Sequence, residues 1–372
     1  MNSYKCSSKK HKGLSFTVNE DNKAIWNNVF GFSASDSPIP ECRGTFFLDT
    51  DEGRFDGDKL DVIECKADAG NLCLIQKVGS FEVCMVMCKD ESTGVISIKP
   101  YVKNTDSKNH TLYACFPRFP VLGNDYEVYS QYTAWCAENQ GEWSDLNAGN
   151  IVLANSAGSS SVSCTPFACI RNKETGKAIA IHLLPIGDWT IKFRKIAGHR
   201  TGYTVIEAGL SNDGLRLPIA AGAELEMPEL LVFGFEGDIR NASEQIQEYI
   251  LPRFPKRHIP DPIFNTWFYN YDVLDVEVLK KQVPIAKKIG CKTFVIDAGW
   301  FGKGLDWENQ VGCWQESTAR AFKGKMKEFG DYVREQGMDF GLWMEPERAG
   351  RDVDVYKNHP DWFMDRMRLS MI

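Results

Sequence analysis

Carboxylates follow two apolar segments in the C-terminal part of the chain. Asp297 comes directly after the apolar run 294–296, and Glu345 and Glu347 follow the run 340–344. In parallel α/β architectures, the groups that do chemistry gather where strands end at their carboxyl side, because the loops converge there. An acid after a strand can equally be the N-cap of the next helix. The position alone therefore leaves both roles open.

Each of these acids lies near a tryptophan. Trp300 follows Asp297, and Trp343 precedes Glu345. An aromatic ring packs on the C–H face of a pyranose, while a carboxylate accepts hydrogen bonds from its hydroxyls, so the combination favours a carbohydrate site over a helix cap. Glu345 and Glu347 come from one strand end, whereas opposed catalytic carboxylates normally come from different strands. We expect them instead to pair with a basic residue such as Arg348.

The elements that position these residues alternate between strands and helices. Apolar runs predict strands over 263–267, 293–296 and 340–344. Apolar residues at three- and four-residue spacing predict helices over 275–289 and 325–336, each ended by a glycine, and Pro284 should kink or split the first helix. Strands that alternate with helices of this length form βαβ units with a parallel sheet.

The larger N-terminal part shows a different period. From about residue 13 to residue 235, apolar and polar residues alternate between turn signals, as in the segment 189–194. This pattern predicts a large antiparallel β-sandwich. A short helix over 243–250 and a segment with four prolines follow, which no helix or central strand tolerates. We therefore expect a β-sandwich domain over 1–240, a helix and proline-rich linker over 241–262, and an α/β domain over 263–372.

Composition excludes several classes of protein. The formal net charge of the 372 residues is −7, which disfavours a nucleic-acid partner. No apolar run approaches the roughly 18 residues of a membrane span, and the N-terminus has no apolar region typical of a secretory signal. We expect a cytoplasmic protein with no membrane partner, whose 12 cysteines are reduced. The six histidines show no metal-ligand spacing, so we expect no metal site.

The segment that contains two tryptophans and two glutamates, 135–143, permits two interpretations. It is either a packed loop of the sandwich or the edge of a sugar pocket, in this subunit or in a neighbour.

Four motifs in the α/β part resemble a known family. They look like the successive barrel motifs of glycoside hydrolase family 36, the melibiase-type α-galactosidases: Asn265-Thr266-Trp267, residues 294–302, residues 337–347, and His359-Pro360-Asp361-Trp362. The resemblance implies an N-terminal β-sandwich followed by a (β/α)₈ barrel. It also implies retaining hydrolysis of terminal α-galactosides, such as those of melibiose or raffinose, without a metal or organic cofactor. We expect a homo-oligomer when the protein has its full length.

The resemblance also assigns substrate-binding residues. Asp297 matches an aspartate that holds galactose hydroxyls, and Trp343 matches a tryptophan of the same pocket, with Trp300 and Trp267 as neighbours. Two positions depart from the family. Ala298 stands where the family has a second aspartate, and Cys313 where it commonly has another. The loss of one charged hydrogen-bond acceptor amounts to roughly 1.5–3 kcal/mol of binding, so the departures leave the sugar specificity open.

The α/β part is short for a complete barrel. Residues 263–372 contain three predicted strands, whereas a closed barrel has eight strands and about 250 residues. In the family, the nucleophile and the acid/base are aspartates that end the fourth and sixth strands, so we expect both beyond residue 372 and assign no catalytic residue within the chain. Two alternatives remain: an α-N-acetylgalactosaminidase or galactosyl-transferring relative, and a non-catalytic sugar-binding or scaffold fragment.

Overall fold

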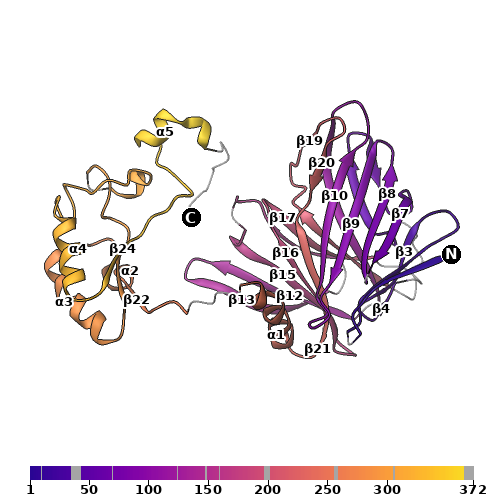
Figure 1. Cartoon of the computed structure of the whole chain (residues 1–372), viewed down its shortest axis with the longest axis horizontal. Helices are drawn as coiled ribbons and strands as arrows, with labels where there is room; N and C mark the ends of the chain where they lie inside the picture. Colours follow the sequence, from indigo (N-terminus) through magenta and orange to yellow (C-terminus); the bar gives the residue numbers. More distant parts are fainter. Residues whose placement is uncertain are drawn as a thin grey trace. The chain divides into compact units, whose positions relative to one another are not determined.

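The computed structural model describes residues 1–9, 11–34, 43–68, 70–123, 125–146, 149–158, 160–196, 202–254, 259–304 and 306–363. The chain divides into two compact units, Met1–Pro255 and Lys256–Ile372, which Figure 1 shows. The first, here called the β unit, consists of antiparallel sheets and the helix α1 (Ile239–Ile250). The second, the α/β unit, alternates parallel strands with helices. The fold class predicted from the two periods is therefore confirmed.

Within the described residues, the β unit contains sheets of ten, seven and four strands. The ten-stranded sheet has the order β13 (Ala137–Asp145), β12 (Tyr126–Ala134), β15 (Ser163–Asn172), β16 (Lys177–Leu184), β21 (Glu229–Glu236), β10 (Ile96–Asn104), β9 (Phe81–Lys89), β8 (Asn71–Val78) and β7 (Asp61–Asp68), with β20 (Glu224–Glu226) beside β10. The seven-stranded sheet has the order β14 (Asn150–Asn155), β17 (Trp189–Ile196), β18 (Tyr203–Leu210), β11 (His110–Leu122), β5 (Phe46–Thr50) and β6 (Gly53–Phe55), with β19 (Leu217–Ile219) beside β11. The four-stranded sheet contains β1 (Asn2–Cys6), β2 (Leu14–Val18), β3 (Ala24–Val29) and β4 (Phe32–Ser33) in that order.

The three sheets share one apolar core. Side chains alternate between the two faces of a strand, and in β9 every second residue from Phe81 to Met87 is buried. One cluster of buried side chains includes Trp26 from β3, Met85 from β9 and Trp189 from β17. Burial of such faces is the main favourable term in folding. The alternation in the sequence therefore identified the core correctly.

Helix α1 belongs to the β unit. It begins after Asp238, whose side chain accepts a hydrogen bond of 2.9 Å from the backbone N–H of Arg240. Its buried residues Ala242 and Tyr249 pack in one cluster with Phe233 of β21. The sequence predicted this helix over 243–250, within the connection 241–262, whereas it begins at Ile239 and its apolar face joins it to the sheet. Residues 255–258 of that connection lie outside the described residues.

The segment 135–143 forms much of a hairpin instead of a loop. Strands β12 and β13 pair in antiparallel register, with Trp135 and Cys136 at the turn. Trp143 packs against Tyr129, with ring centroids 5.3 Å apart, and the guanidinium of Arg171 lies 3.9 Å from the indole centroid. Trp135, in contrast, is 83% exposed. Packing accounts for Trp143, and a sugar-binding role of the turn stays a prediction.

The α/β unit contains a parallel sheet of β22 (Ile263–Asn265), β23 (Thr293–Ile296) and β24 (Asp339–Leu342), in that order among the described residues. Its helical elements are α2 (Trp267–Asn270), α3 (Val276–Lys288), α4 (Met326–Glu335) and α5 (Asp354–Asn358), with 3₁₀ turns at Glu308–Gln310 and Pro360–Trp362; a further 3₁₀ turn, Leu251–Arg253, follows α1. The three predicted strands and the two predicted long helices are confirmed, with ends that shift by one or two residues.

Helix α3 is not split at Pro284. Asp275 caps its N-terminus by accepting hydrogen bonds from the N–H groups of Glu277 and Val278, and the helix continues past the proline to Lys288. A proline inside a helix leaves the carbonyl four residues earlier without its usual donor. Here the hydroxyl of Tyr332 in α4 donates to that carbonyl, of Lys280, at 3.1 Å. We expected Pro284 to kink or split the helix. The split is wrong, and Tyr332 of α4 supplies the missing donor; the kink stays a prediction.

Two further expectations concern cysteines and membranes. The eleven cysteines among the described residues are free, which agrees with the prediction of reduced thiols. Cys42 lies outside the described residues. In the part of the chain that the structure describes, no helix has the length and apolar character needed to cross a membrane.

Candidate carbohydrate site at the ends of the parallel strands

The carboxyl ends of the three parallel strands lie at the same edge of the sheet. Asn265 is in register with Val295, and Ile296 with Leu342. The ladder continues one step beyond the strands, since the N–H of Thr266 donates to the carbonyl of Val295 and that of Trp343 to the carbonyl of Ile296, at 3.1 and 2.8 Å. Asp297 is thus flanked by the segments that carry Thr266 and Trp343, as the strand-end argument predicts.

Asp297 is buried and held in one orientation. Asp297 is 8% exposed, and its Oδ2 accepts a hydrogen bond of 2.6 Å from Nδ2 of Asn265. Its Oδ1 accepts from the N–H of Ala298 at 2.7 Å, and its own N–H donates to Oγ1 of Thr266 at 3.0 Å. A carboxylate has about four acceptor positions, so sites remain for further donors. The carboxylate is fixed before any ligand arrives.

Five tryptophans of the unit form a continuous aromatic cluster beside this edge: Trp267, Trp300, Trp307, Trp314 and Trp343. The ring centroids of Trp343 lie 6.2 Å from those of Phe301 and Trp307 and 6.4 Å from that of Trp314. Trp267 meets Trp307 edge to face at 6.1 Å. Such offset and edge-on contacts hold rings in defined orientations. Trp267 and Trp343 are therefore connected through Trp307, which the sequence did not single out.

Trp300 has a different environment from the other two predicted tryptophans. It is 3% exposed, whereas Trp267 and Trp343 are half-buried. Its indole N–H donates to the backbone carbonyl of Trp343 at 3.0 Å. Trp300 thus holds the segment that carries Trp343 through this hydrogen bond. Direct contact of Trp300 with a sugar stays a prediction.

An ion pair that the sequence did not reveal contacts the aromatic cluster. Asp272 pairs with Arg320 at 2.9 Å and accepts a hydrogen bond of 3.0 Å from the indole N–H of Trp307. The hydrogen bond from Arg320 lowers the pKa of Asp272 below its ordinary value, and that from Trp307 acts in the same direction. The two partners are 48 residues apart. No local pattern in the sequence signals this contact.

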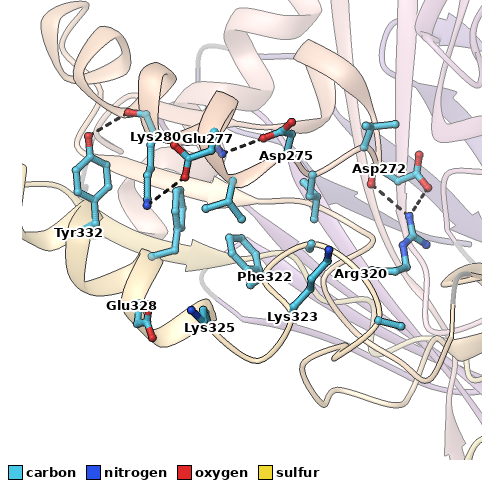
Figure 2. Close-up of a pocket in the computed structure, with 16 residues that line it drawn as sticks. Asp272, Asp275, Glu277, Lys280, Arg320, Phe322, Lys323, Lys325, Glu328 and Tyr332 are labelled. Carbon is cyan, nitrogen blue, oxygen red and sulfur yellow. Dashed lines mark hydrogen bonds and ion pairs between the residues drawn. The ribbon is translucent and has the colours of Figure 1, made fainter.

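The α/β unit also contains a cavity that does not lie at Asp297. A volume of about 1000 Å³ opens near the N-terminal parts of α3 and α4, and Figure 2 shows its lining, which includes Glu277, Lys280 and Lys323. Of the residues discussed above, Asp272 and Arg320 line it, but Asp297 and the tryptophans do not. The cavity is a separate, mixed-charge feature, so it does not define the sugar site.

The remaining sequence candidates can also be placed. Glu345 pairs with Arg348 at 2.7 Å, which confirms the expected ion pair, and Glu347 is exposed. Ala298 is 1% exposed, and its methyl group offers no hydrogen bond. Cys313 is half-buried and free. Among the described residues of this unit, no group of His, Cys, Asp and Glu side chains has the spacing of a metal site.

Two family models match the chain. The model described as "Glycosyl hydrolase family 36 N-terminal domain" matches residues 63–205, and the model described as "Melibiase" matches residues 230–370. The second match includes Asp297 and all the tryptophans of the aromatic cluster.

Curated relatives are alpha-galactosidases. One from Lactobacillus acidophilus is 28% identical over 251 residues, which are 65% of this chain and 34% of that protein. A bifunctional alpha-galactosidase/sucrose kinase from Mediterraneibacter gnavus is 26% identical over 308 residues, which are 80% of this chain and 32% of that protein. The matched region thus spans about a third of the length of these relatives.

Solved structures show the same fold. The alpha-galactosidase from Lactobacillus brevis superposes with a TM-score of 0.79 at 19% identity, covering 97% of this chain and 57% of that one. A variant of the alpha-galactosidase AgaA from Geobacillus stearothermophilus in complex with raffinose gives 0.77 at 18% identity, covering 99% and 60%. Taken with the two family models, which cover most of the sequence, these likenesses show that the chain belongs to glycoside hydrolase family 36, the melibiase family, and contains its N-terminal domain and the start of its catalytic domain.

Proposed function

We propose that this chain is the N-terminal part of an α-galactosidase that hydrolyses terminal α-galactosides with retention of configuration. The observation that carries the proposal is the buried, preoriented carboxylate of Asp297 at the carboxyl edge of the parallel sheet, beside Trp343. Solved relatives of the same family hold raffinose and stachyose. These oligosaccharides are the substrate class that we infer for the complete protein.

In this proposal, Asp297 orients the sugar. Asn265 and the N–H of Ala298 occupy part of its acceptor capacity, and the remaining lone pairs accept hydrogen bonds from sugar hydroxyls. Hydrogen bonds to an ionised acceptor are roughly twice as strong as neutral ones. Trp343 and Trp267 pack on the C–H faces of the ring, and Trp300 and Arg320 hold neighbouring segments in place.

The two carboxyl groups that perform the hydrolysis come, in this proposal, from sequence after residue 372. A retaining glycosidase needs a nucleophile and an acid/base about 5–5.5 Å apart on either side of the scissile bond. Glu345 is engaged by Arg348, and Asp297 by Asn265 and Ala298. The chain as given is therefore expected to contribute binding and not chemistry.

The test uses the protein encoded by the whole open reading frame that contains this chain, with raffinose as the substrate. Asp297→Asn keeps the shape of the side chain but removes its charge, so we expect kcat/KM to fall at least about 100-fold, because the lost contacts strengthen in the transition state. Asp339→Asn is the matched control, since Asp339 is an exposed aspartate at the amino end of β24, and it should leave kcat/KM within about twofold. Unchanged kinetics in Asp297→Asn would exclude the assignment.

A sugar-binding role without hydrolysis is the second candidate. It is favoured by the engagement of Glu345 with Arg348, which leaves the described strand ends without an opposed pair of free carboxylates. Calorimetric titration of the 372-residue chain with raffinose separates the two candidates. Binding that is lost in Asp297→Asn, together with a reading frame that stops at Ile372, would favour this role. A panel with α-N-acetylgalactosaminides tests whether Ala298 changes the preferred sugar.

A further inference from the structure

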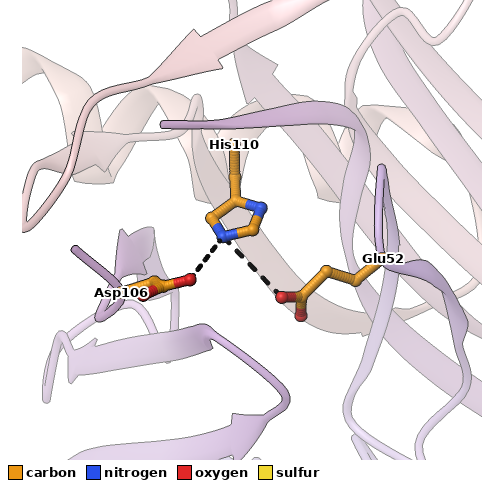
Figure 3. A group of neighbouring side chains, drawn as sticks. All are labelled: Glu52, Asp106 and His110. Carbon is orange, nitrogen blue, oxygen red and sulfur yellow. Dashed lines mark hydrogen bonds and ion pairs between the residues drawn. The ribbon is translucent and has the colours of Figure 1, made fainter. Parts of the chain in front are cut away.

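Three side chains with metal-ligating atoms converge in the β unit, whereas the candidate carbohydrate site belongs to the α/β unit (Figure 3). Nε2 of His110, the first residue of β11, lies 3.1 Å from Oδ2 of Asp106 and 3.7 Å from Oε1 of Glu52. All three ligand atoms lie within 4.8 Å of one another. Glu52 comes from the turn between β5 and β6, and Asp106 from the connection between β10 and β11. Two groups from the segment 106–110 and one from residue 52 thus share one point.

The carboxylate of Asp51 orients the imidazole of His110. Its other nitrogen, Nδ1, lies 3.1 Å from Oδ1 of Asp51, and its ring meets that of Phe81 edge to face at 5.3 Å. Without an ion, a proton on Nε2 is donated to Oδ2 of Asp106. When a metal ion replaces that proton, a proton on Nδ1 donated to Asp51 leaves the lone pair of Nε2 for the ion at the point shared with Glu52 and Asp106. Histidines that bind metals almost always donate their second nitrogen to such a carboxylate or carbonyl. The side chain of His110 is 11% exposed, so packing holds this orientation.

Both carboxylates are fixed by donors of their own. Glu52 accepts hydrogen bonds from the N–H and Oγ of Ser80, at 2.9 and 2.6 Å. Asp106 accepts through Oδ1 from the N–H of Ser107 at 2.6 Å, which leaves Oδ2 for the shared point. Nδ2 of Asn104 donates to the carbonyls of Lys108 and Ile219 and so shapes the connection that carries Asp106. The arrangement does not need a ligand to bring it together.

We propose that Glu52, Asp106 and His110 bind a divalent transition-metal ion of the Zn²⁺ class, with water in the remaining position. Ligands at about 2.0–2.1 Å in a tetrahedral site lie about 3.4 Å from one another, and the distances of 3.1 and 3.7 Å from Nε2 bracket that value. One imidazole with two carboxylates suits Zn²⁺ or Mn²⁺, whereas Ca²⁺ takes oxygen ligands.

The ion has a structural role in this proposal. β5, β6 and β11 belong to the seven-stranded sheet, whereas β10 belongs to the ten-stranded sheet. Glu52 is also bound to Ser80, in the turn between β8 and β9 of the ten-stranded sheet. A metal at the shared point therefore links the ends of both sheets. Because such a site exists only in the folded state, the binding of the ion adds to stability.

The test titrates the chelator-treated 372-residue chain with Co²⁺ as a spectroscopic probe and with Zn²⁺ by calorimetry. We expect one equivalent to bind, with d–d absorption but no sulfur-to-metal charge transfer, which separates this site from the free cysteines. Glu52→Gln and Asp106→Asn should each weaken binding at least tenfold, as should His110→Gln. Asp51→Asn, which removes only the orienting partner, should weaken it about 10- to 100-fold.

His11→Gln is the matched control. His11 lies in the same unit, and its Nε2 contacts the carbonyl of Ser92 and no carboxylate of the described residues, so the bound equivalent should remain. Circular dichroism of each variant without metal establishes that it is folded. If His110→Gln does not fold, Asp106→Asn, which keeps the imidazole, tests the proposal in its place. Absence of the equivalent in the parent chain, equal affinity in the parent and Asp106→Asn, or a thiolate spectrum would overturn the proposal, and His110 would then be an ion-paired histidine only.

Discussion

At the scale of the residue, the contribution of a charged group to the stability of either unit depends on how much water surrounds it. Arg118 of β11 is 1% exposed and Glu207 of β18 is 4% exposed, and their side chains pair at 2.6 Å. Arg194 adds a second contact to the same carboxylate at 3.1 Å. Charges removed from water depend on their partners, because the loss of one partner leaves the other buried without compensation.

Glu207→Gln should therefore lower the free energy of unfolding strongly. We expect about 3 kcal/mol, the lower part of the range for a broken buried pair, because Asp56 still pairs with Arg118 at 2.7 Å. Urea denaturation measures the change. Arg54→Gln is the control, since Arg54 pairs with Asp49 but is 77% exposed, and its effect should stay below about 1 kcal/mol. Equal effects of the two substitutions would contradict the argument.

Asp272 gives a prediction about pH. Its pKa lies below the ordinary value of 3.8 in the folded chain, chiefly because Arg320 donates to it. Folding therefore favours the ionised form, so the stabilisation is present above pH 3.8 and is lost as the pH falls through the lower, folded pKa.

Asp272→Asn should lower the free energy of unfolding at neutral pH by at most about 1 kcal/mol, because the carboxylate is partly exposed and water screens the pair. The difference from the parent chain should begin to shrink as the pH falls below 3.8, and it should vanish only once the pH lies below the lowered, folded pKa of Asp272. Urea denaturation at several pH values checks this. A difference that does not shrink at any pH below 3.8 at which the chain remains folded would assign the effect to the hydrogen bonds of Asp272 and not to its charge.

At the scale of the element, helix α3 shows how a neighbour can override a local rule. Pro284 removes one donor from the helix, and the hydroxyl of Tyr332 in α4 donates to the carbonyl of Lys280 in its place. Tyr332→Phe leaves that carbonyl without the donor, so we expect a loss of about 0.5–1.5 kcal/mol in the free energy of unfolding.

The same substitution should cost less when residue 284 can donate. In Pro284→Ala the backbone N–H reaches the carbonyl of Lys280, so Tyr332→Phe in that background should have a clearly smaller effect. A double-mutant cycle, measured by urea denaturation of the four proteins, isolates this coupling. Additive effects would show that the hydroxyl and the proline act independently.

Local signals in the sequence located most elements of the α/β unit. The helix cap Asp275 and the terminal glycines Gly290 and Gly337 act within one turn, so both helices were predicted to within one or two residues. Strand β13 was missed because most of its residues are polar and exposed, and only its pairing with β12 holds it extended. Strand β1 was missed for a related reason, because its residues are mostly exposed and polar.

In the candidate site, too, some contacts follow from local sequence signals and others do not. Asp297 and Trp343 follow strands directly, and parallel register alone brings them to one edge. Asp272 and Arg320, in contrast, meet only through the folding of two loops. The cluster around His110 likewise joins residues 59 positions apart, such as Asp51 and His110. The sequence therefore predicted which strand ends carry the site, but not the contacts that brace it.

At the scale of the whole molecule, the two compact units differ in how completely they bury their own structure. The β unit has a core to which all three of its sheets contribute. In the α/β unit, β22 and β24 each pair only with β23 among the described residues, so the sheet presents two edges. Parallel sheets normally occur with both faces covered, and open edges favour association with other strands.

Residues 1–254 expressed alone should therefore fold to a soluble protein with a cooperative thermal transition and the circular dichroism of β structure. Residues 259–372 alone should aggregate or lack a cooperative transition, because their three short strands do not form a closed sheet. Size-exclusion chromatography and thermal denaturation of the two proteins test this difference. A monomeric, cooperatively folding C-terminal protein would show that its edges are covered within the chain, and would favour the non-catalytic sugar-binding role over that of a catalytic barrel completed by further sequence.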